Sequence, residues 1–163
     1  SSATQFCGEL SCVVPSSVDS IRVVMEIISP FLKAVFSRSD QRRVELGIEE
    51  VLQNAHEHGN LGISFGEKGA ACDAGNWEEL LAERNAVACK DGKQITVKID
   101  VQGGMFSCTV TDQGGGFNWG EFKKNQIGGD RLHGRGLLYV EQAFDELCFN
   151  DIGNSVTLRK QLG

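Results

Sequence analysis

Apolar side chains recur at helical spacing in the first third of this chain. Between residues 18 and 36 they return every three or four positions, which predicts an amphipathic helix. Pro30 lies inside this segment and is expected to kink or split the helix, because proline lacks a backbone donor and clashes with the preceding turn. After a break at residues 37–40, a second segment of the same period predicts a helix to His58, stopped by Gly59.

Alternating apolar and polar residues predict extended strands in most of the remaining chain. Residues 94–101 alternate with period two, and the Gly103-Gly104 pair that follows predicts a tight hairpin turn. A third helix is expected from residue 136 to about residue 144. Five strands are expected, at residues 6–14, 94–101, 105–111, 146–150 and 155–160.

These elements predict an α/β (α+β) two-layer sandwich in a single domain spanning residues 1–163. A mixed, mostly antiparallel sheet of about five strands would be covered on one face by about three helices. Residues 62–92, which we call the insert, begin with a Gly-, Ala- and Cys-rich stretch of no clear period, and a short helix is expected at 77–88. Residues 117–133 predict a mobile loop or lid because they lack a period and contain several glycines.

The overall charge narrows the classes of partner. A net charge of −6 and a pI near 5.1 argue against a nucleic-acid partner, which would need a basic face. No run approaches the roughly 18 apolar residues of a membrane span, and no signal peptide is recognisable. We therefore expect a cytoplasmic protein without membrane contact. Since the sequence lacks an initiating Met, whether it is a segment of a longer protein stays open.

Six cysteines are present, and none forms a Cys-x-x-Cys pair. A zinc site that combines cysteines with His56 and His58 is one interpretation. The simpler interpretation is six reduced thiols, several of them buried, in a cytosolic protein.

The second predicted helix places polar side chains along one border of its apolar stripe. Glu50, Asn54 and His58 follow one another at four-residue spacing and so share this border. A carboxylate and a carboxamide one turn apart, at the edge of a core, are suited to a metal–phosphate site. A solvated helix flank is the alternative for Glu50.

Two glycine-rich segments add candidate binding chemistry. Asp112 leaves a strand into three glycines, where its carboxylate could accept a hydrogen bond from an exocyclic amine; the alternative is an Asx turn that closes the strand. Gly134 and Gly136 flank Arg135 at a helix start, which favours anions; the alternative is a glycine-rich helix entry without a ligand. No Walker A loop or complete Rossmann fingerprint is present.

The three segments, in this order, resemble the N, G1 and G2 boxes of the GHKL (histidine kinase-like) ATP-binding superfamily. Within it they are most similar to the bacterial anti-sigma factor serine/threonine protein kinases. The resemblance covers nearly the whole chain outside the insert, which is longer than the family's short connection, and three consecutive glycines in the G1 box are unusual. The matching pattern is Glu50-x-x-x-Asn54-Ala55-x-x-His58-Gly59, then Asp112-x-Gly114-x-Gly116-Phe117, then Gly134-Arg135-Gly136-Leu137.

The resemblance implies a GHKL (Bergerat-type) fold and roles for residues that bind Mg²⁺ and ATP. Asn54 would ligate the Mg²⁺ that bridges the ATP phosphates. Glu50 would be the general base that deprotonates a Ser or Thr hydroxyl of a protein substrate. Asp112 would hold the adenine amino group. For His58 the role is left open, with a hydrogen bond at the helix end preferred over catalysis.

The glycine-rich boxes would complete the nucleotide site. Gly114 and Gly116 would make room for the base and begin the lid. The G2 box would line the phosphates through Gly134, Arg135, Gly136 and Leu137.

The resemblance further implies an ATP-dependent kinase that phosphorylates a small STAS-domain anti-anti-sigma factor and sequesters a sigma factor or similar regulator. Two alternatives stay open, namely the catalytic domain of a sensor histidine kinase and a non-catalytic ATP-binding partner switch. A GHKL hydrolase clamp is disfavoured because such proteins carry further domains. Whether the protein forms a homodimer is also open.

Overall fold

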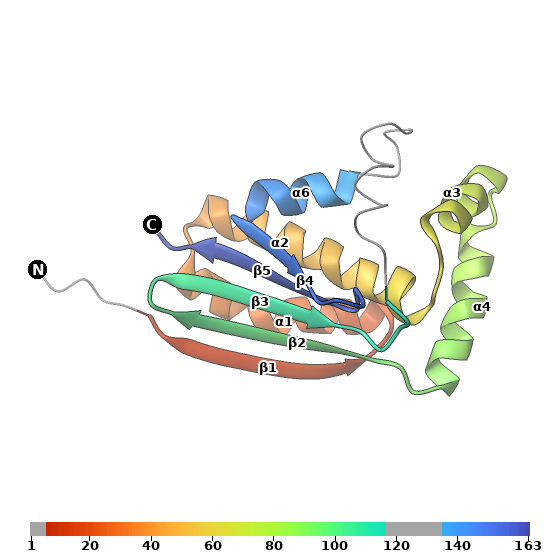
Figure 1. Cartoon of the computed structure of the whole chain (residues 1–163), viewed down its shortest axis with the longest axis horizontal. Coiled ribbons are helices and arrows are strands. Elements are labelled where there is room, and N and C mark those ends of the chain that lie inside the picture. The colour runs from red at the N-terminus through yellow and green to blue at the C-terminus, as the bar shows by residue number, and fades with distance from the viewer. Residues whose placement is uncertain (1–5, 117–134) are drawn as a thin grey trace, which may run out of the picture.

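A single open sheet with helices on one face forms the body of the protein, as seen in a computed structural model that describes residues 6–116 and 135–163 (Figure 1). Its strand order is β1-β2-β3-β5-β4, and all four pairings are antiparallel. The expected five strands are therefore confirmed, although the described sheet is antiparallel throughout and not mixed. The strands are β1 (Gly8–Pro15), β2 (Gln94–Gln102), β3 (Met105–Thr111), β4 (Glu146–Phe149) and β5 (Ser155–Gln161).

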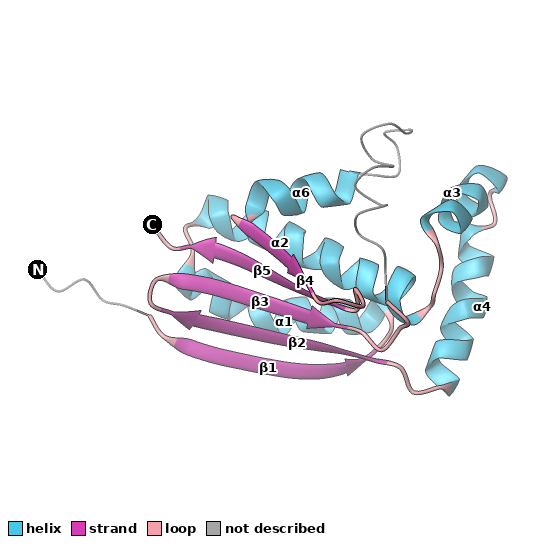
Figure 2. Cartoon of the chain, in the orientation of Figure 1, coloured by secondary structure: helices cyan, strands magenta, loops and turns pink. Residues whose placement is uncertain are grey.

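Helices account for most of the remaining described residues. Figure 2 shows α1, α2 and α6 on one side of the sheet, with α3 and α4 together at one end of the molecule. This is the expected two-layer sandwich, with the three expected helices covering one face. The described helices are α1 (Val18–Val35), α2 (Arg38–Asn54), the π-helix η1 (Ala55–Asn60), α3 (Phe65–Ala74), α4 (Trp77–Lys90) and α6 (Arg135–Ala143).

The core lies between the sheet and the three helices that cover it, α1, α2 and α6. Every second residue of β2 is buried, from Ile95 to Val101, while the intervening side chains face away. On α1 the buried positions are Ile21, Val24, Ile28 and Leu32, which return every three or four residues. Burying each such side chain contributes about 1.5–3 kcal/mol, so the two periods of the sequence directly select the two layers.

None of the described helices has the length and hydropathy of a membrane span.

Pro30 was expected to kink or split the first helix, and the expected split is wrong. One helix runs from Val18 to Val35 with Pro30 inside it, and the proline is exposed. The buried stripe continues on both sides of Pro30, at Ile28 and Leu32, so core packing holds the two halves in one helix despite the lost backbone hydrogen bond.

The second helix also ends differently from the prediction. Regular α2 stops at Asn54, and the chain then widens into the π-helix η1, whose last hydrogen bond joins the Leu61 N–H to the His56 carbonyl at 2.9 Å. Gly59 does not stop a helix, because it lies inside η1. The chain leaves η1 at Gly62, whose φ of +64° is a left-handed conformation.

The insert is helical in both halves. The expected helix at 77–88 is confirmed as α4, whereas α3 occupies most of the stretch for which no period was recognised. Ser64 begins α3 by accepting the Glu67 N–H at 3.0 Å. The insert also has a small apolar cluster of its own, formed by Leu61, Ile63, Ala88, Trp77, Leu80 and Leu81.

Candidate functional site

A pocket opens where the end of α2 and η1 meet the ends of β3 and β5. Its volume is about 340 Å³, including the open mouth. It brings together Asn54 and Asp112, which are 58 positions apart in the numbering and which sequence reasoning had singled out separately. The lining residues are Val51, Asn54, Ala55, His58, Gly59, Phe65, Val110, Asp112, Gly153, Asn154, Ser155 and Val156.

Asp112 presents a nearly buried carboxyl group to this pocket. Only 8% of the residue is exposed, and Oδ1 accepts the Gly114 N–H at 2.8 Å. Burial raises the pKa of Asp112 to about 6, against the lowering effects of that hydrogen bond and of Lys93. The Asx turn considered as an alternative therefore exists, and the same carboxyl group also lines the pocket.

Gly59 and the glycines after Asp112 allow three backbone segments to approach closely. A Cβ atom on Gly59 would overlap the Asp112 carboxyl group, and one on Gly114 would overlap the Gly59 carbonyl oxygen. Gly116, at φ +99°, leaves no space for a Cβ beside the Ile152 carbonyl. These contacts explain, from the packing of the chain itself, why glycine occupies these positions. That Gly114 and Gly116 make room for the base of ATP stays a prediction.

Asn60 ties this arrangement together, and sequence reasoning missed it. Its Oδ1 accepts the Gln113 N–H at 2.7 Å, while its Nδ2 donates to the Gln94 carbonyl at 2.9 Å. The last residue of η1 thus holds the segment that follows Asp112 against the start of β2. An Asn directly after Gly59 gave no sign of this contact, because its partners are distant in sequence.

Asn54 and Glu50 lie on consecutive turns of α2. Asn54 is half-buried and lines the pocket, and its carboxamide has no hydrogen-bond partner among residues 6–116 and 135–163. Glu50 is also half-buried but does not line the pocket. Desolvation raises the pKa of Glu50 and Lys68 lowers it, with Glu57 and Glu49 raising it further. Glu50 is therefore not an ordinary solvated flank residue.

A buried ion pair connects the insert to η1, and sequence reasoning missed both partners. Lys68 Nζ of α3 lies 2.6 Å from Glu57 Oε2, and only 4% of the Glu57 side chain is exposed. Gln53 donates to the other carboxylate oxygen of Glu57 at 3.0 Å, and Lys68 lies over the Trp77 ring at 4.9 Å from its centroid. A buried carboxylate is stable only when paired in this way.

The two histidines of η1 have separate structural contacts. His58 Nδ1 lies 2.5 Å from the Ile63 carbonyl oxygen, which is the hydrogen bond expected at the helix end. His56 Nδ1 pairs with the buried Ser16 hydroxyl at 2.7 Å, and burial lowers the pKa of both imidazoles. Within the described part of the chain, no group of three or more His, Cys, Asp or Glu side chains could hold a metal ion. The six cysteines are free thiols, and Cys108 is buried.

The third predicted segment lies partly outside the described residues. Gly134 and the lid expected at 117–133 are not among them. Helix α6 begins at Arg135 and ends at Ala143, which confirms the helix expected there. The phosphate-binding role of Gly134, Arg135, Gly136 and Leu137 stays a prediction.

Comparison with known proteins agrees with this geometry. A family model described as the histidine kinase-like ATPase domain matches residues 14–160. The chain belongs to the histidine kinase-like ATPase family. It is thus an ATP-binding domain of the GHKL type, and the pocket between Asn54 and Asp112 lies where two of the three segments that resemble its boxes meet. A search of curated proteins found no match.

Proposed function

We propose that this ATPase domain is a Mg-ATP-dependent serine/threonine protein kinase of the anti-sigma type. The observation that carries the proposal is the geometry of α2, where a half-buried carboxylate, Glu50, lies one turn from Asn54 at the pocket. A domain that only bound ATP would need Asn54 and Asp112 but would have no use for a desolvated carboxylate beside them. Burial raises the pKa of Glu50, which makes it a better proton acceptor.

The proposed reaction transfers the γ-phosphoryl group of ATP to a protein hydroxyl. Glu50 takes the proton from a Ser or Thr hydroxyl while the hydroxyl oxygen bonds to the γ-phosphorus. The bond between the γ-phosphorus and the β-phosphate oxygen breaks, which releases ADP. When bound, Mg²⁺ would neutralise phosphate charge. The carboxamide oxygen of Asn54, which lines the pocket, fits this ion, which takes few protein ligands and keeps waters and substrate phosphates. Asp112 would accept from the adenine amino group.

The partners follow from the proposed subgroup. The phosphoacceptor would be a small STAS-domain anti-anti-sigma factor, and the sequestered partner a sigma factor or similar regulator in the cytoplasm. The resemblance of the three boxes supports this assignment, and the acidic surface charge is compatible with protein partners.

A phosphotransfer assay tests the proposal. The protein is incubated with Mg²⁺ and γ-labelled ATP in lysate of its own host, beside Glu50→Gln and the matched control Glu49→Gln, whose side chain is exposed on the preceding position of α2. We expect acid-stable label on a small protein, lost by at least about 100-fold in Glu50→Gln and retained in the control. Acid-labile label would indicate a histidine kinase domain instead. Nucleotide binding without any label would indicate a non-catalytic switch.

A further inference from the structure

Helix α3 reaches the nucleotide pocket although it belongs to the insert. Phe65, its first residue, lines the pocket together with Asn54, Gly59 and Asp112. The Phe65 ring also stacks on His58, with ring centroids 3.8 Å apart and an angle of 27° between the planes. The insert therefore supplies an aromatic ring to a site otherwise built from the boxes and the sheet.

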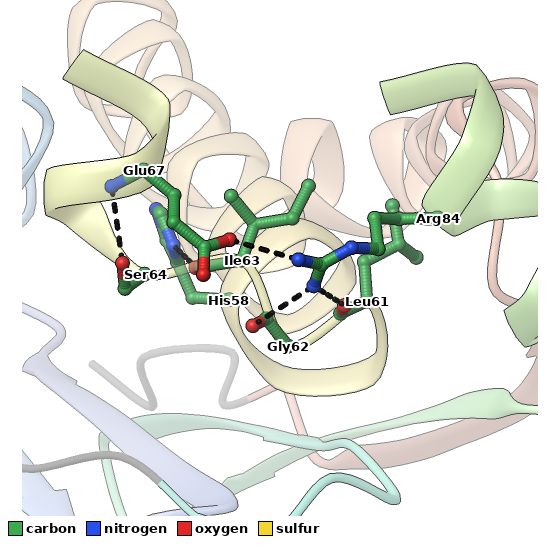
Figure 3. Close-up of polar contacts among 7 residues, drawn as sticks. All are labelled: His58, Leu61, Gly62, Ile63, Ser64, Glu67 and Arg84. Atoms are coloured by element: carbon green, nitrogen blue, oxygen red, sulfur yellow. Dashed lines mark hydrogen bonds and ion pairs between the residues drawn. The ribbon is translucent and has the colours of Figure 1, made fainter. Parts of the chain in front are cut away.

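The start of α3 is held in place by hydrogen bonds of Ile63, Ser64 and Glu67, which flank Phe65 in sequence and are drawn in Figure 3. Before it, His58 Nδ1 bonds to the Ile63 carbonyl, so the ring that Phe65 stacks on is itself oriented by the backbone of the loop. After it, the Glu67 N–H donates to the Ser64 hydroxyl at 3.0 Å and closes the first turn of α3. These hydrogen bonds therefore fix the first turn of α3, which contains Phe65, beside the pocket.

A second group of contacts joins this turn to α4 and η1. Arg84 of α4 donates to the Leu61 and Gly62 carbonyls at 3.4 and 3.5 Å, and it pairs with Glu67 at 3.1 Å (Figure 3). The buried ion pair between Lys68 and Glu57 holds the next turn of α3. Because these contacts restrain the helix independently of a ligand, the ring of Phe65 is pre-organised, which lowers the entropy cost of binding against it.

We propose that Phe65 is a nucleotide-binding residue, forming an aromatic wall for the purine base of ATP. The base end of the pocket is favoured over the phosphate end, because Phe65 stacks on His58 and the next residue, Gly59, packs directly on the Asp112 carboxyl group. A flat base gains from an aromatic neighbour, whereas charged phosphates do not. The inference rests on the ATP-binding pocket of the proposed function but does not require phosphotransfer.

Calorimetric titration with ATP tests this role on the wild type, Phe65→Ala and Phe65→Leu. The matched control is Val87→Ala, an apolar truncation at an exposed position of α4 in the same insert. We expect Phe65→Ala to raise the Kd for ATP by at least about 5-fold, and Phe65→Leu to raise it by more than about 2-fold because the aromatic face is lost. Val87→Ala should bind within about 2-fold of the wild type.

Inorganic triphosphate, used as a competitor, separates a base contact from general damage to the site. Its affinity should be unchanged in the Phe65 variants, since it carries no base. Equal losses for ATP and triphosphate would overturn the inference, as would a Kd for ATP within about 2-fold of the wild type in Phe65→Ala. If Phe65→Ala lacks a cooperative thermal transition, the inference is judged on Phe65→Leu alone, which must raise the Kd for ATP by more than about 2-fold. If the Phe65 variants bind ATP more weakly but the protein transfers no phosphate, this inference is supported and the kinase is refuted. If the protein transfers phosphate but the Phe65 variants bind ATP like the wild type, the kinase is supported and this inference is refuted.

Discussion

At the residue scale, Asp112 shows how the binding role proposed for a side chain conflicts with stability. Its carboxyl group is nearly buried, and its pKa is raised to about 6 from an ordinary value near 3.8. The folded protein therefore binds this proton more tightly than the unfolded chain does. As the pH rises towards 6, the folded protein loses the stability that its tighter proton binding contributes. Above pH 6 the full cost of burying the ionised carboxylate, of order 3 kcal/mol, is present. A hydrogen-bond donor from a ligand would offset that cost.

Asp112→Asn should therefore separate the two effects. An amide oxygen can still accept the Gly114 N–H, but it carries no charge to desolvate. Without nucleotide at pH 7, we expect the free energy of unfolding to rise by about 1 kcal/mol or more, while the Kd for ATP rises by at least about 10-fold. The stability gain should vanish below about pH 3, where Asp112 is protonated in both states. Denaturant unfolding at several pH values measures it, and a variant less stable than the wild type at pH 7 would contradict this account.

At the scale of elements, the change from α2 to η1 positions the site. The wider π-helical turn carries Gly59 to the Asp112 carboxyl group and Asn60 to the segment after it. Such π-helical turns are frequent at functional sites because they displace a side chain without ending the helix. The close approach also explains why residue 59 is glycine, since any Cβ there would overlap Asp112.

Gly59→Ala tests this role of η1. The added methyl group must displace the Asp112 carboxyl group, and we expect a loss of about 1–3 kcal/mol in unfolding free energy together with weaker ATP binding. Gly69→Ala in α3 is the matched control, because its Cβ would meet nothing within 4 Å. There the same substitution should stabilise the protein by about 0.5–1 kcal/mol. A Gly59→Ala protein as stable as the wild type, and with the same Kd, would show that the contact is unimportant.

At the scale of the whole molecule, the insert is bound to the body through few but buried interactions. Figure 1 shows α3 and α4 beside one end of the sheet, away from the three covering helices. The buried pair of Lys68 and Glu57 crosses this boundary, and so does the stacking of Phe65 on His58. The insert should therefore be energetically coupled to η1.

Lys68→Met should leave the Glu57 carboxylate buried without its cation. We expect a loss of about 3 kcal/mol in unfolding free energy at pH 7, and recovery of part of it in the double variant Lys68→Met, Glu57→Gln. Arg22→Met is the control, since both partners of its ion pair with Glu26 are mostly exposed; its effect should stay below about 0.5 kcal/mol. Thermal or urea unfolding of the four proteins checks this, and equal losses for Lys68→Met and Arg22→Met would refute the coupling.

The sequence by itself determined the two layers, most of the elements and the candidate residues for the chemistry. Period-two burial on β2 and the stripe on α1 are local patterns whose burial energy leaves one arrangement of faces. The Gly103-Gly104 turn was equally local, and both glycines have the positive φ values that such a hairpin requires. The order of the three segments around Asn54, Asp112 and Arg135 along the chain sufficed to indicate the family to which it belongs.

Only the tertiary structure decided the contacts between segments distant in sequence. No local pattern could show that Gly59 packs on Asp112, that Lys68 pairs with Glu57, or that Phe65 enters the pocket. Helix α3 was missed for a related reason, since glycines and alanines give little periodicity and its stability comes from a cap, from packing on α4 and from the ion pair of Lys68. Pro30 was misjudged in the opposite direction, because packing on both sides outweighs a local penalty. Burial and pairing depend on the folded surroundings, whereas periodicity depends only on the chain.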